Sequence, residues 1–119
     1  MNIRPATRSD IQQIASIHIE SWKDAYRNDL PSEFIDGKID LIMKQHWDDI
    51  EIKPEDILLV AKEQALVGFV SVWCRPAPYI DNLHVKPSHR SQKYGSALLQ
   101  AAAREIVRRG HKSAYLLVF

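Results

Sequence analysis

Basic residues gather in the segment VKPSHRSQKYGSALL, which begins at Val85. Arg90 and Lys93 are positively charged, His89 can add to that charge, and Gly95 is the only glycine of the segment. A loop between a strand and the start of a helix can bind an anion, because the first helical N–H groups lack partners within the helix and the helix dipole favours negative charge. A phosphate or pyrophosphate would suit this combination, but by themselves these residues are a weak signal, because many basic loops precede helices only for solubility.

Three side chains just before this loop could transfer protons. Asp81 is a carboxylic acid, Tyr79 has a hydroxyl, and His84 has an ordinary pKa of about 6.5, which suits acid–base chemistry. Each has a structural alternative: Asp81 can cap a turn or pair with a basic residue, and the two rings can pack in a strand. Simple strand alternation places His84 on one face and, on the other, Tyr79, Asp81, Leu83 and Val85. A bulge would change that assignment.

Other common chemistries have no matching pattern in the chain. It contains no G-x-x-x-x-G-K-[ST] and no G-x-G-x-x-G after its first strand, which disfavours P-loop and dinucleotide sites. The histidines lack metal-ligand spacing, so we expect no metal site. Cys74, the only cysteine, lies in an apolar run and is expected to pack in the core rather than act as a nucleophile.

Composition indicates one soluble domain over residues 1–119. The 16 basic and 15 acidic residues give a net charge of +1, which does not favour nucleic-acid binding. No apolar run approaches the ~18 residues of a membrane span, and the start has no signal-peptide core. A single cysteine excludes an internal disulfide, so we expect a cytoplasmic protein.

The first half of the chain is predicted to be a strand followed by helices. Residues 2–6 form the strand, and Thr7–Asp10 has the form of a capping box that starts a helix. Spacings of three and four define the apolar stripe of this helix: Ile11, Ile14, Ala15, His18, Trp22, Ala25 and Tyr26. The helix ends at 28–31.

Two further helical pieces are predicted before the sheet continues. Ser32 can cap a short piece that is interrupted near Gly37, and Asp40 can cap a longer helix that contains Trp47. Lys53-Pro54 ends this helix, because the residue before proline avoids helical angles.

The second half is predicted to be a hairpin, a third strand, a helix and a last strand. The strands are 56–62, 66–73 and 79–85, and the final strand is 113–119. The helix begins near Gly95 and ends before Gly110, and its inward stripe is Gly95, Leu98, Leu99, Ala102 and Ile106. The order is therefore β-α-α-β-β-β-α-β, and its last β-α-β unit predicts two parallel strands.

The segment LHVKPSHRSQKYGSALL resembles the acyl-CoA-binding motif of the GNAT superfamily of N-acetyltransferases. In that motif a strand ends in hydrophobic-x-Val, a proline follows, and R/Q-x-x-G-x-G/A opens a helix. Val85 and Pro87 match, Arg90 takes the R/Q position and Gly95 the last glycine, whereas Lys93 stands where the first glycine is expected. The element order and the segment SIHIESWKDAY extend the resemblance over nearly the whole chain.

The resemblance implies an α/β fold of the α+β type, with a mixed central sheet flanked by helices, and acetyl-CoA as co-substrate without a metal. The pyrophosphate would lie on the amides of residues 92–96, and the pantetheine arm would pair with the backbone beside the third central strand. The implied cofactor-binding residues are Leu83, His84, Val85, Arg90, Ser91, Gln92, Lys93, Tyr94, Gly95 and Ser96. Ser91 replaces a glycine that is common in the motif but not required.

Lysine at position 93 has two opposing energetic effects. If residue 93 needs a left-handed conformation, lysine costs about 1 kcal/mol relative to glycine. A charge-assisted contact to phosphate could return ~1–2 kcal/mol. The two effects are close, so the departure is compatible with CoA binding.

The implied reaction is transfer of acetyl to a primary amine of a small molecule or protein. Asp81, His84 and Tyr79 are the candidates for proton transfer, and a backbone N–H near Val85 could polarise the carbonyl. Trp22 and Tyr26 would line the acceptor pocket, or else pack in the core.

The resemblance also predicts a C-terminally truncated domain. The chain stops at Phe119 within an apolar strand, where the family continues into a further helix and two strands. The family's thiolate-protonating tyrosine would lie on that helix, so the general acid has no candidate by position. The rival interpretation is therefore a non-catalytic CoA-binding or interaction module. We further expect an oligomer through the C-terminal edge strand, because unpaired edges promote association.

Overall fold

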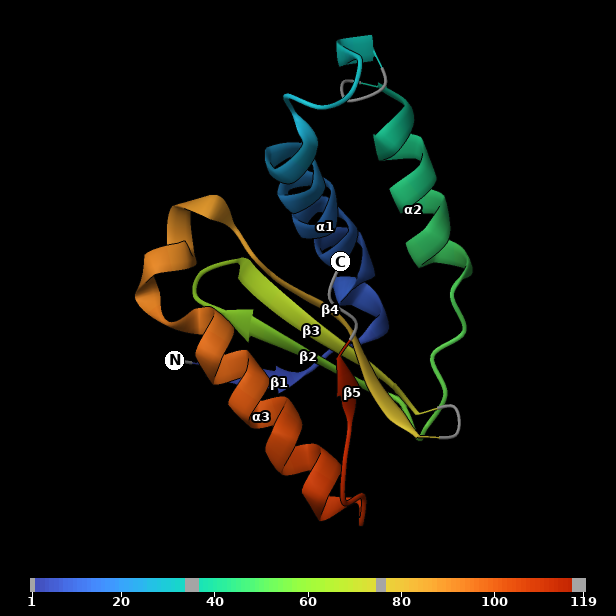
Figure 1. The fold of residues 1–119 in the computed structure, drawn as a ribbon, viewed down its shortest axis with the longest axis vertical. Coiled ribbons are helices and arrows are strands. Elements are labelled where there is room, and N and C mark those ends of the chain that lie inside the picture. The colour runs from blue at the N-terminus through green and yellow to red at the C-terminus, as the bar shows by residue number, and fades with distance from the viewer. Residues whose placement is uncertain (1, 34–36, 75–76, 117–119) are drawn as a thin grey trace.

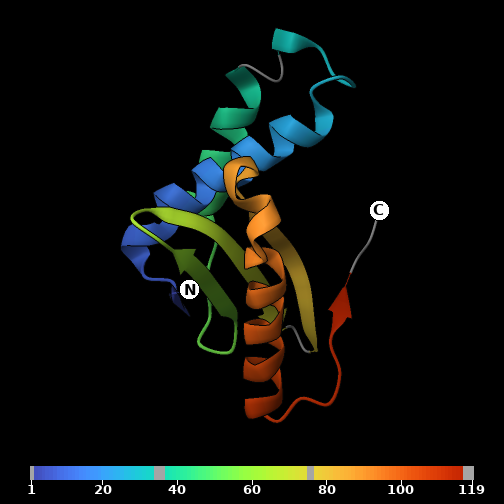
Figure 2. The ribbon, with the colours of Figure 1, turned by 90° about the vertical axis from the view of Figure 1, so that its left-hand side faces the viewer.

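The computed structural model describes residues 2–33, 37–74 and 77–116. Its one sheet has the strand order β1-β2-β3-β4-β5, and helices cover both faces (Figures 1 and 2). The elements are β1 (Asn2–Pro5), the 3-10 turn η1 (Arg8–Asp10), α1 (Ile11–Tyr26), α2 (Ile39–Asp49), β2 (Ile57–Lys62), β3 (Leu66–Cys74), β4 (Pro78–Val85), the 3-10 turn η3 (Pro87–Gln92), α3 (Tyr94–Arg108) and β5 (Tyr115–Leu116). The predicted order and the α+β fold class are confirmed.

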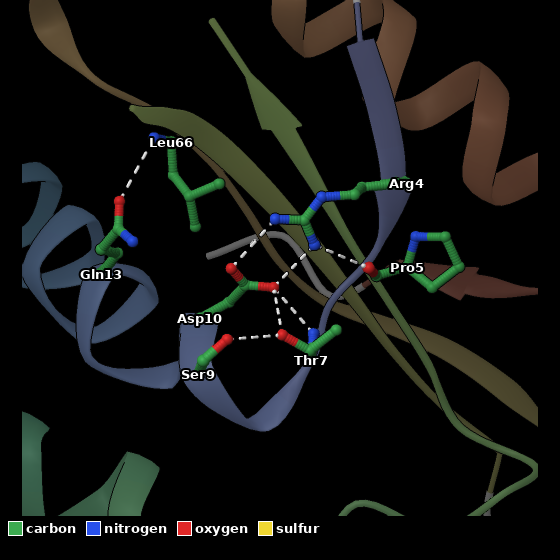
Figure 3. Close-up of polar contacts among 7 residues, drawn as sticks. All are labelled: Arg4, Pro5, Thr7, Ser9, Asp10, Gln13 and Leu66. Atoms are coloured by element: carbon green, nitrogen blue, oxygen red, sulfur yellow. Dashed lines mark hydrogen bonds and ion pairs between the residues drawn. The ribbon is translucent and has the colours of Figure 1, made fainter. Parts of the chain in front are cut away.

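The start of α1 is tied to β1 by a buried carboxylate. The Thr7 N–H donates to Asp10 Oδ2 over 2.7 Å, as the capping box predicts, and the Arg4 guanidinium donates to both Asp10 oxygens over 2.8 and 3.1 Å (Figure 3). The Arg4 hydrogen bonds hold the pKa of Asp10 well below its ordinary value. These contacts fix the direction in which α1 leaves the first strand and crosses the sheet.

The sheet separates two apolar cores. The core beneath α3, which we call the α3-side core, contains Ile57, Leu59, Val70, Val72, Val85, Tyr94, Leu98, Ala102 and Ile106. The core beneath α1 and α2, the α1-side core, contains Ile11, Ile14, Ile17, Trp47, Leu58, Val60, Phe69 and Trp73. Both faces of β3 are covered, which explains why all nine of its residues are buried. Cys74 is buried at its end, as predicted.

A β-bulge interrupts β4 at Asp81. Ser71 of β3 pairs with Asn82, and the next residue, Val72, pairs with Ile80, so Asp81 has no partner in the ladder. The extra residue shifts the side-chain alternation of the strand by one position.

The prediction from simple alternation was therefore wrong for the first part of β4. Tyr79 packs against the α1-side core, and Asp81 and His84 contact residues of that same core. Leu83 and Val85 pack in the α3-side core instead. The bulge thus brings the three candidate proton-transfer residues to one face of the sheet.

The last strand pairs in parallel with β4, as the β-α-β order predicts. Tyr115 lies opposite Tyr79 and Leu116 opposite Ile80. The predicted strand over 113–119 is described as β5 only at its centre, since 117–119 lie outside the described residues. Within the described part of the chain, β5 pairs with β4 no further than Ile80, and no described strand pairs with the outer edge of β4 from Asn82 to Val85, which we call the open edge.

Some predicted helix details differ from the structure. Lys38, not Asp40, precedes α2, and Asp40 lies inside the first turn, where it forms an ion pair of 2.8 Å with Lys23. The short helical piece after Ser32 runs into residues 34–36, which lie outside the described residues. The α3 helix begins at Tyr94, one residue early, and Leu99 of its predicted inward stripe is exposed. In the described segments, none of the helices is long and apolar enough to cross a membrane.

Candidate functional site

The open edge of β4 presents backbone groups away from β3. The Lys86 N–H donates to the Val67 carbonyl over 2.8 Å, and the His84 carbonyl also faces β3, close to Gly68. Because backbone groups alternate along a strand, the groups of Leu83 and Val85 face the opposite edge, beyond the last described pair of β4 with β5. An extended ligand can pair with this edge.

The open edge leads into the basic loop, residues 86–93, and then into the N-terminus of α3. The loop forms the turn η3, and Lys93 connects it to the helix with φ 67° and ψ 16°, in the left-handed region. The first helical bond is donated by Ala97 to Lys93 over 3.1 Å, so the amides of Tyr94, Gly95 and Ser96 precede the helical ladder. These amides are the ones that the sequence predicts to bind an anion.

Gly95 has no structural reason within the chain to be glycine. Its φ lies outside the left-handed region, and a Cβ there would contact only Val85 Cγ2, at 3.9 Å. A glycine in the middle of a first helical turn costs up to about 1 kcal/mol relative to alanine. The missing side chain therefore fits the close approach of a group from outside the protein, such as a pyrophosphate.

Tyr94 anchors the start of α3 to the sheet. The side chain is buried in the α3-side core, and its hydroxyl donates to Glu63 beyond the end of β2. This contact holds the first turn of the helix against the sheet, so its amides are fixed in position before a ligand arrives.

Arg90 lies against α1. Its Nη1 forms an ion pair with Asp24, its Nε donates to the Val85 carbonyl over 3.3 Å, and its Nη2 lies 3.5 Å from Ser21 Oγ. The side chain predicted for phosphate binding thus ties the basic loop to α1, the helix that also carries Trp22 and Tyr26. Sequence reasoning did not identify Ser21 or Asp24, because only the folded chain brings α1 and the loop together.

His84 lies at the centre of the α1-side face and is largely covered. Its Nδ1 lies 2.9 Å from Ser21 Oγ, and its Nε2 lies 3.4 Å from Asn82 Oδ1. Burial, helped by the charge of Arg90, lowers the pKa of His84 below its ordinary value. The imidazole is therefore neutral at pH 7 and able to accept a proton.

His18 stacks on His84, with ring centroids 4.7 Å apart and an interplanar angle of 28°. Its Nδ1 accepts a hydrogen bond of 3.0 Å from Trp47 Nε1. Burial lowers the pKa of His18 to about 4, and the neighbouring His84 and His46 act in the same direction. The sequence placed His18 in the apolar stripe of α1, and a titratable ring at such a position was the available signal of its contact with the site.

The carboxylate of Asp81 already accepts hydrogen bonds from several side chains. Trp73 Nε1 donates to Oδ2 and the Tyr79 hydroxyl donates to Oδ1, each over 2.8 Å, and Asn82 Nδ2 adds a bond of 3.2 Å. The hydrogen bond to Asp81 raises the pKa of Tyr79. Tyr79 is thus a proton donor in this structure, and the Asp81 carboxylate already accepts three hydrogen bonds, which leaves His84 as the candidate base.

Trp22 and Tyr26 form a ring pair on the C-terminal half of α1, with centroids 4.7 Å apart. Tyr26 is 44% exposed and Trp22 is half-buried, so neither belongs to the buried cores. The core-packing alternative is therefore wrong for Tyr26, and the pair lies on the helix that also carries Ser21.

The described residues contain no group of three or more histidine, cysteine or acidic residues that could hold a metal ion. A cavity of about 740 Å³ lies at the other end of the sheet, between β1, β2 and α3, and none of the predicted site residues line it.

Among the described residues, an unpaired stretch of β4 thus leads to the N-terminal amides of α3. Residues 15–119 match the family model described as "Acetyltransferase (GNAT) family". The chain therefore belongs to the GNAT acetyltransferase family, whose members are generally acetyl-CoA-dependent acetyltransferases.

Solved structures share the fold at low sequence identity. A PaiA N-acetyltransferase from Thermoplasma acidophilum, in complex with coenzyme A, has a TM-score of 0.75 and 22% identity, over 98% of this chain and 78% of that one. A ribosomal-protein-alanine N-acetyltransferase from Brucella melitensis has a TM-score of 0.70 and 20% identity, over 99% and 79%. A predicted acetyltransferase with acetyl-CoA from Clostridium acetobutylicum has a TM-score of 0.68 and 17% identity, over 98% and 80%. No curated protein matches the chain.

Proposed function

We propose that this protein is an acetyl-CoA-dependent N-acetyltransferase that acts on a primary amine of a small molecule or a protein. The observation that carries the proposal is the open β4 edge leading to the α3 amides beside Gly95. Family membership and the CoA-bound structural neighbours support it.

In the proposed enzyme, most contacts to acetyl-CoA would be made by backbone groups. Leu83 and Val85 would pair with the pantetheine arm, and the amides of residues 92–96 would hold the pyrophosphate. The basic loop contributes Arg90, Ser91 and Lys93 beside these amides, and Lys93 adds positive charge. When bound, acetyl-CoA supplies an acetyl group as a reactive thioester.

The residues proposed to take part in proton transfer and acceptor binding lie on the α1-side face of the sheet. His84 is neutral at pH 7 and acts as the base, whereas Tyr79 and Asp81 hold the bulge in shape through their hydrogen bond. An outward N–H near Val85 can donate to a developing oxyanion. Trp22 and Tyr26 would contact the acceptor, and an aromatic pair suits a cationic amine.

The alternative is a CoA-binding or interaction module without catalysis. Association through β5 would suit either function, because Tyr115 is 61% exposed on this outer strand. Light scattering at ~100 μM should then show a dimer or larger species. A strictly monomeric protein would reject association but leave the proposed reaction intact.

Calorimetric titration with CoA, acetyl-CoA and ATP, followed by thiol-release assays with a panel of amines, tests the proposal. We expect binding of both CoA species and amine-dependent thiol release. Binding without turnover would favour the module, and no CoA binding at millimolar concentration would reject both functions.

Substitution of Gly95 tests the proposed pyrophosphate site at the start of α3. Gly95→Ala should raise the free energy of unfolding by up to about 1 kcal/mol, because no atom of the chain obstructs the new methyl group. It should weaken CoA binding at least about tenfold, which corresponds to 1.4 kcal/mol, and Gly95→Val should weaken it further. Gly37→Ala, at a glycine with open space around it, is the matched control. Unchanged CoA affinity in both Gly95 variants would contradict the proposed pyrophosphate site at the start of α3.

A further inference from the structure

We propose that Ser21 is a catalytic residue that passes a proton from the acceptor amine to His84. The inference rests on the proposed function and goes beyond it by assigning the group that touches the amine. It is carried by the 2.9 Å contact between Ser21 Oγ and His84 Nδ1, and by the way the remaining surface of His84 is covered.

The hydrogen-bond network determines which nitrogen of His84 carries the proton. Asn82 Nδ2 lies 3.2 Å from a carboxylate oxygen of Asp81, which can only accept, and 3.0 Å from Ser71 Oγ. The amide nitrogen of Asn82 therefore faces these groups, and its oxygen faces His84 Nε2 at 3.4 Å. An amide oxygen only accepts, so the proton of neutral His84 is on Nε2. The lone pair on Nδ1 accordingly accepts the hydroxyl of Ser21.

The other approaches to His84 are occupied. The His18 ring stacks on it, and the Phe69 ring lies 5.5 Å away from it, centroid to centroid. Asn82 covers Nε2. Within the described residues, Nδ1 is therefore reached by way of Ser21, which is half-buried on α1 one position before Trp22.

Charged and titratable groups surround this pair from each packed element. Arg90 of η3 lies 3.5 Å from Ser21 Oγ and is itself paired with Asp24 of α1. Asp81 of β4 favours the protonated imidazole of His84, whereas Arg90 disfavours it. Burial and the neighbouring His84 in turn lower the pKa of His18, which stacks on His84. The guanidinium of Arg90 stabilises the negative charge that develops on Oγ as its proton leaves.

The amine nitrogen forms the new C–N bond, and the C–S bond breaks with its electron pair on sulfur. One N–H proton moves to Ser21 Oγ while the Ser21 proton moves to His84 Nδ1, so the hydroxyl is restored and the imidazole becomes cationic. Ser21 is not acylated, and no redox partner is required.

Ser21→Ala should lower kcat about 10- to 100-fold, within the range of general acid–base catalysis. The KM for acetyl-CoA and the Kd for CoA should stay within about twofold, because the β4 edge and the α3 amides are untouched. Ser21→Thr should restore most of kcat, since it keeps the hydroxyl. Ser16→Ala is the matched control, because the exposed Ser16 on the same helix donates to the Gln12 carbonyl of its own helix. Normal kcat in Ser21→Ala would overturn the relay while leaving the acetyltransferase function standing.

Nitrogen-15 NMR of the imidazole rings provides a readout that does not need turnover. We expect the wild-type His84 proton on Nε2 at pH 7.5, and an increased share of the Nδ1-protonated tautomer in Ser21→Ala. The Nδ1-protonated form in the wild-type protein would overturn the relay, because Ser21 would then face a donor. If CoA binds and no amine is acetylated by the wild type, the reaction and the relay both fail, and the tautomer result shows separately whether the contact exists.

Discussion

Lys93 is the only described non-glycine residue with a positive φ, and it stands where the basic loop becomes α3. The conformation follows from the geometry of the connection, since the chain must turn from η3 into a helix that starts one residue later. A Cβ in the left-handed region costs roughly 1–2 kcal/mol, part of which is offset because glycine loses more backbone entropy on folding.

Lys93→Gly should therefore stabilise the fold by about 1 kcal/mol. Urea unfolding at pH 7.5 measures the difference. Lys93→Ala is the informative control, because it removes the charge but keeps the left-handed Cβ. An equal gain in stability in both variants would show that charge, rather than backbone strain, is the cause.

The same two variants separate the roles of Lys93 in binding. If the ammonium contacts phosphate, CoA affinity should fall by a similar factor in Lys93→Ala and Lys93→Gly. If backbone freedom matters more, Lys93→Gly should bind CoA more tightly than the wild type. Calorimetry with CoA distinguishes the two results.

At the scale of elements, the site depends on the close approach of α3, β3 and β4 around Gly68. A Cβ at Gly68 would lie 2.9 Å from the His84 carbonyl and 3.1 Å from Leu98 Cδ1. The glycine therefore allows β4 to lie flat against β3 at the position that carries His84.

Gly68→Ala should lower the free energy of unfolding by about 1–3 kcal/mol, because the added methyl group meets backbone and cannot be accommodated by a side-chain rotation. Thermal unfolding followed by circular dichroism measures this effect, with Gly37→Ala as control. The substitution should also displace His84, which would appear as an altered His84 imidazole signal. A Gly68→Ala protein as stable as the wild type would contradict the close approach of β4 to β3 at Gly68.

The elements that follow simple periodicity were predicted well from the sequence, whereas the interruptions were not. The stripe through Leu98, Ala102 and Ile106 located α3, and the apolar runs located β2 and β3. The bulge at Asp81 escaped prediction because a one-residue insertion in a ladder depends on the partner strand. The cofactor edge was predictable because it uses backbone groups, but the Ser21 to His84 contact joins residues 63 positions apart and required the fold.

At the scale of the whole molecule, two stacked histidines make the fold sensitive to acid. The pKa of His18 is about 4 in the folded protein, against 6.5 ordinarily, because burial disfavours its charged form. Between these values the unfolded chain binds more protons than the folded one, so stability falls as pH decreases. The loss begins near pH 6.5 and is complete near pH 4, and His84 contributes in the same direction.

We expect the free energy of unfolding to fall by about 2 kcal/mol between pH 7.5 and pH 5, using 1.36 kcal/mol per pKa unit. His18→Gln should retain an acceptor for Trp47 and lose most of this pH dependence. Urea unfolding of both proteins at the two pH values is the measurement. A wild-type protein equally stable at pH 5 and pH 7.5 would show that His18 remains accessible to protons.

The three tryptophans of the chain occupy three different working parts of the molecule. Trp47 is fully buried and bonded to His18, Trp73 holds Asp81 at the bulge, and Trp22 is paired with Tyr26 on α1. Their indole N–H resonances are therefore three built-in reporters. The Trp47 signal would follow acid titration of the core, that of Trp73 would follow occupancy of the β4 edge, and that of Trp22 would follow arrival of an amine. A panel of unlabelled compounds could thus be screened for the acceptor by one-dimensional NMR, before any catalytic assay has been established.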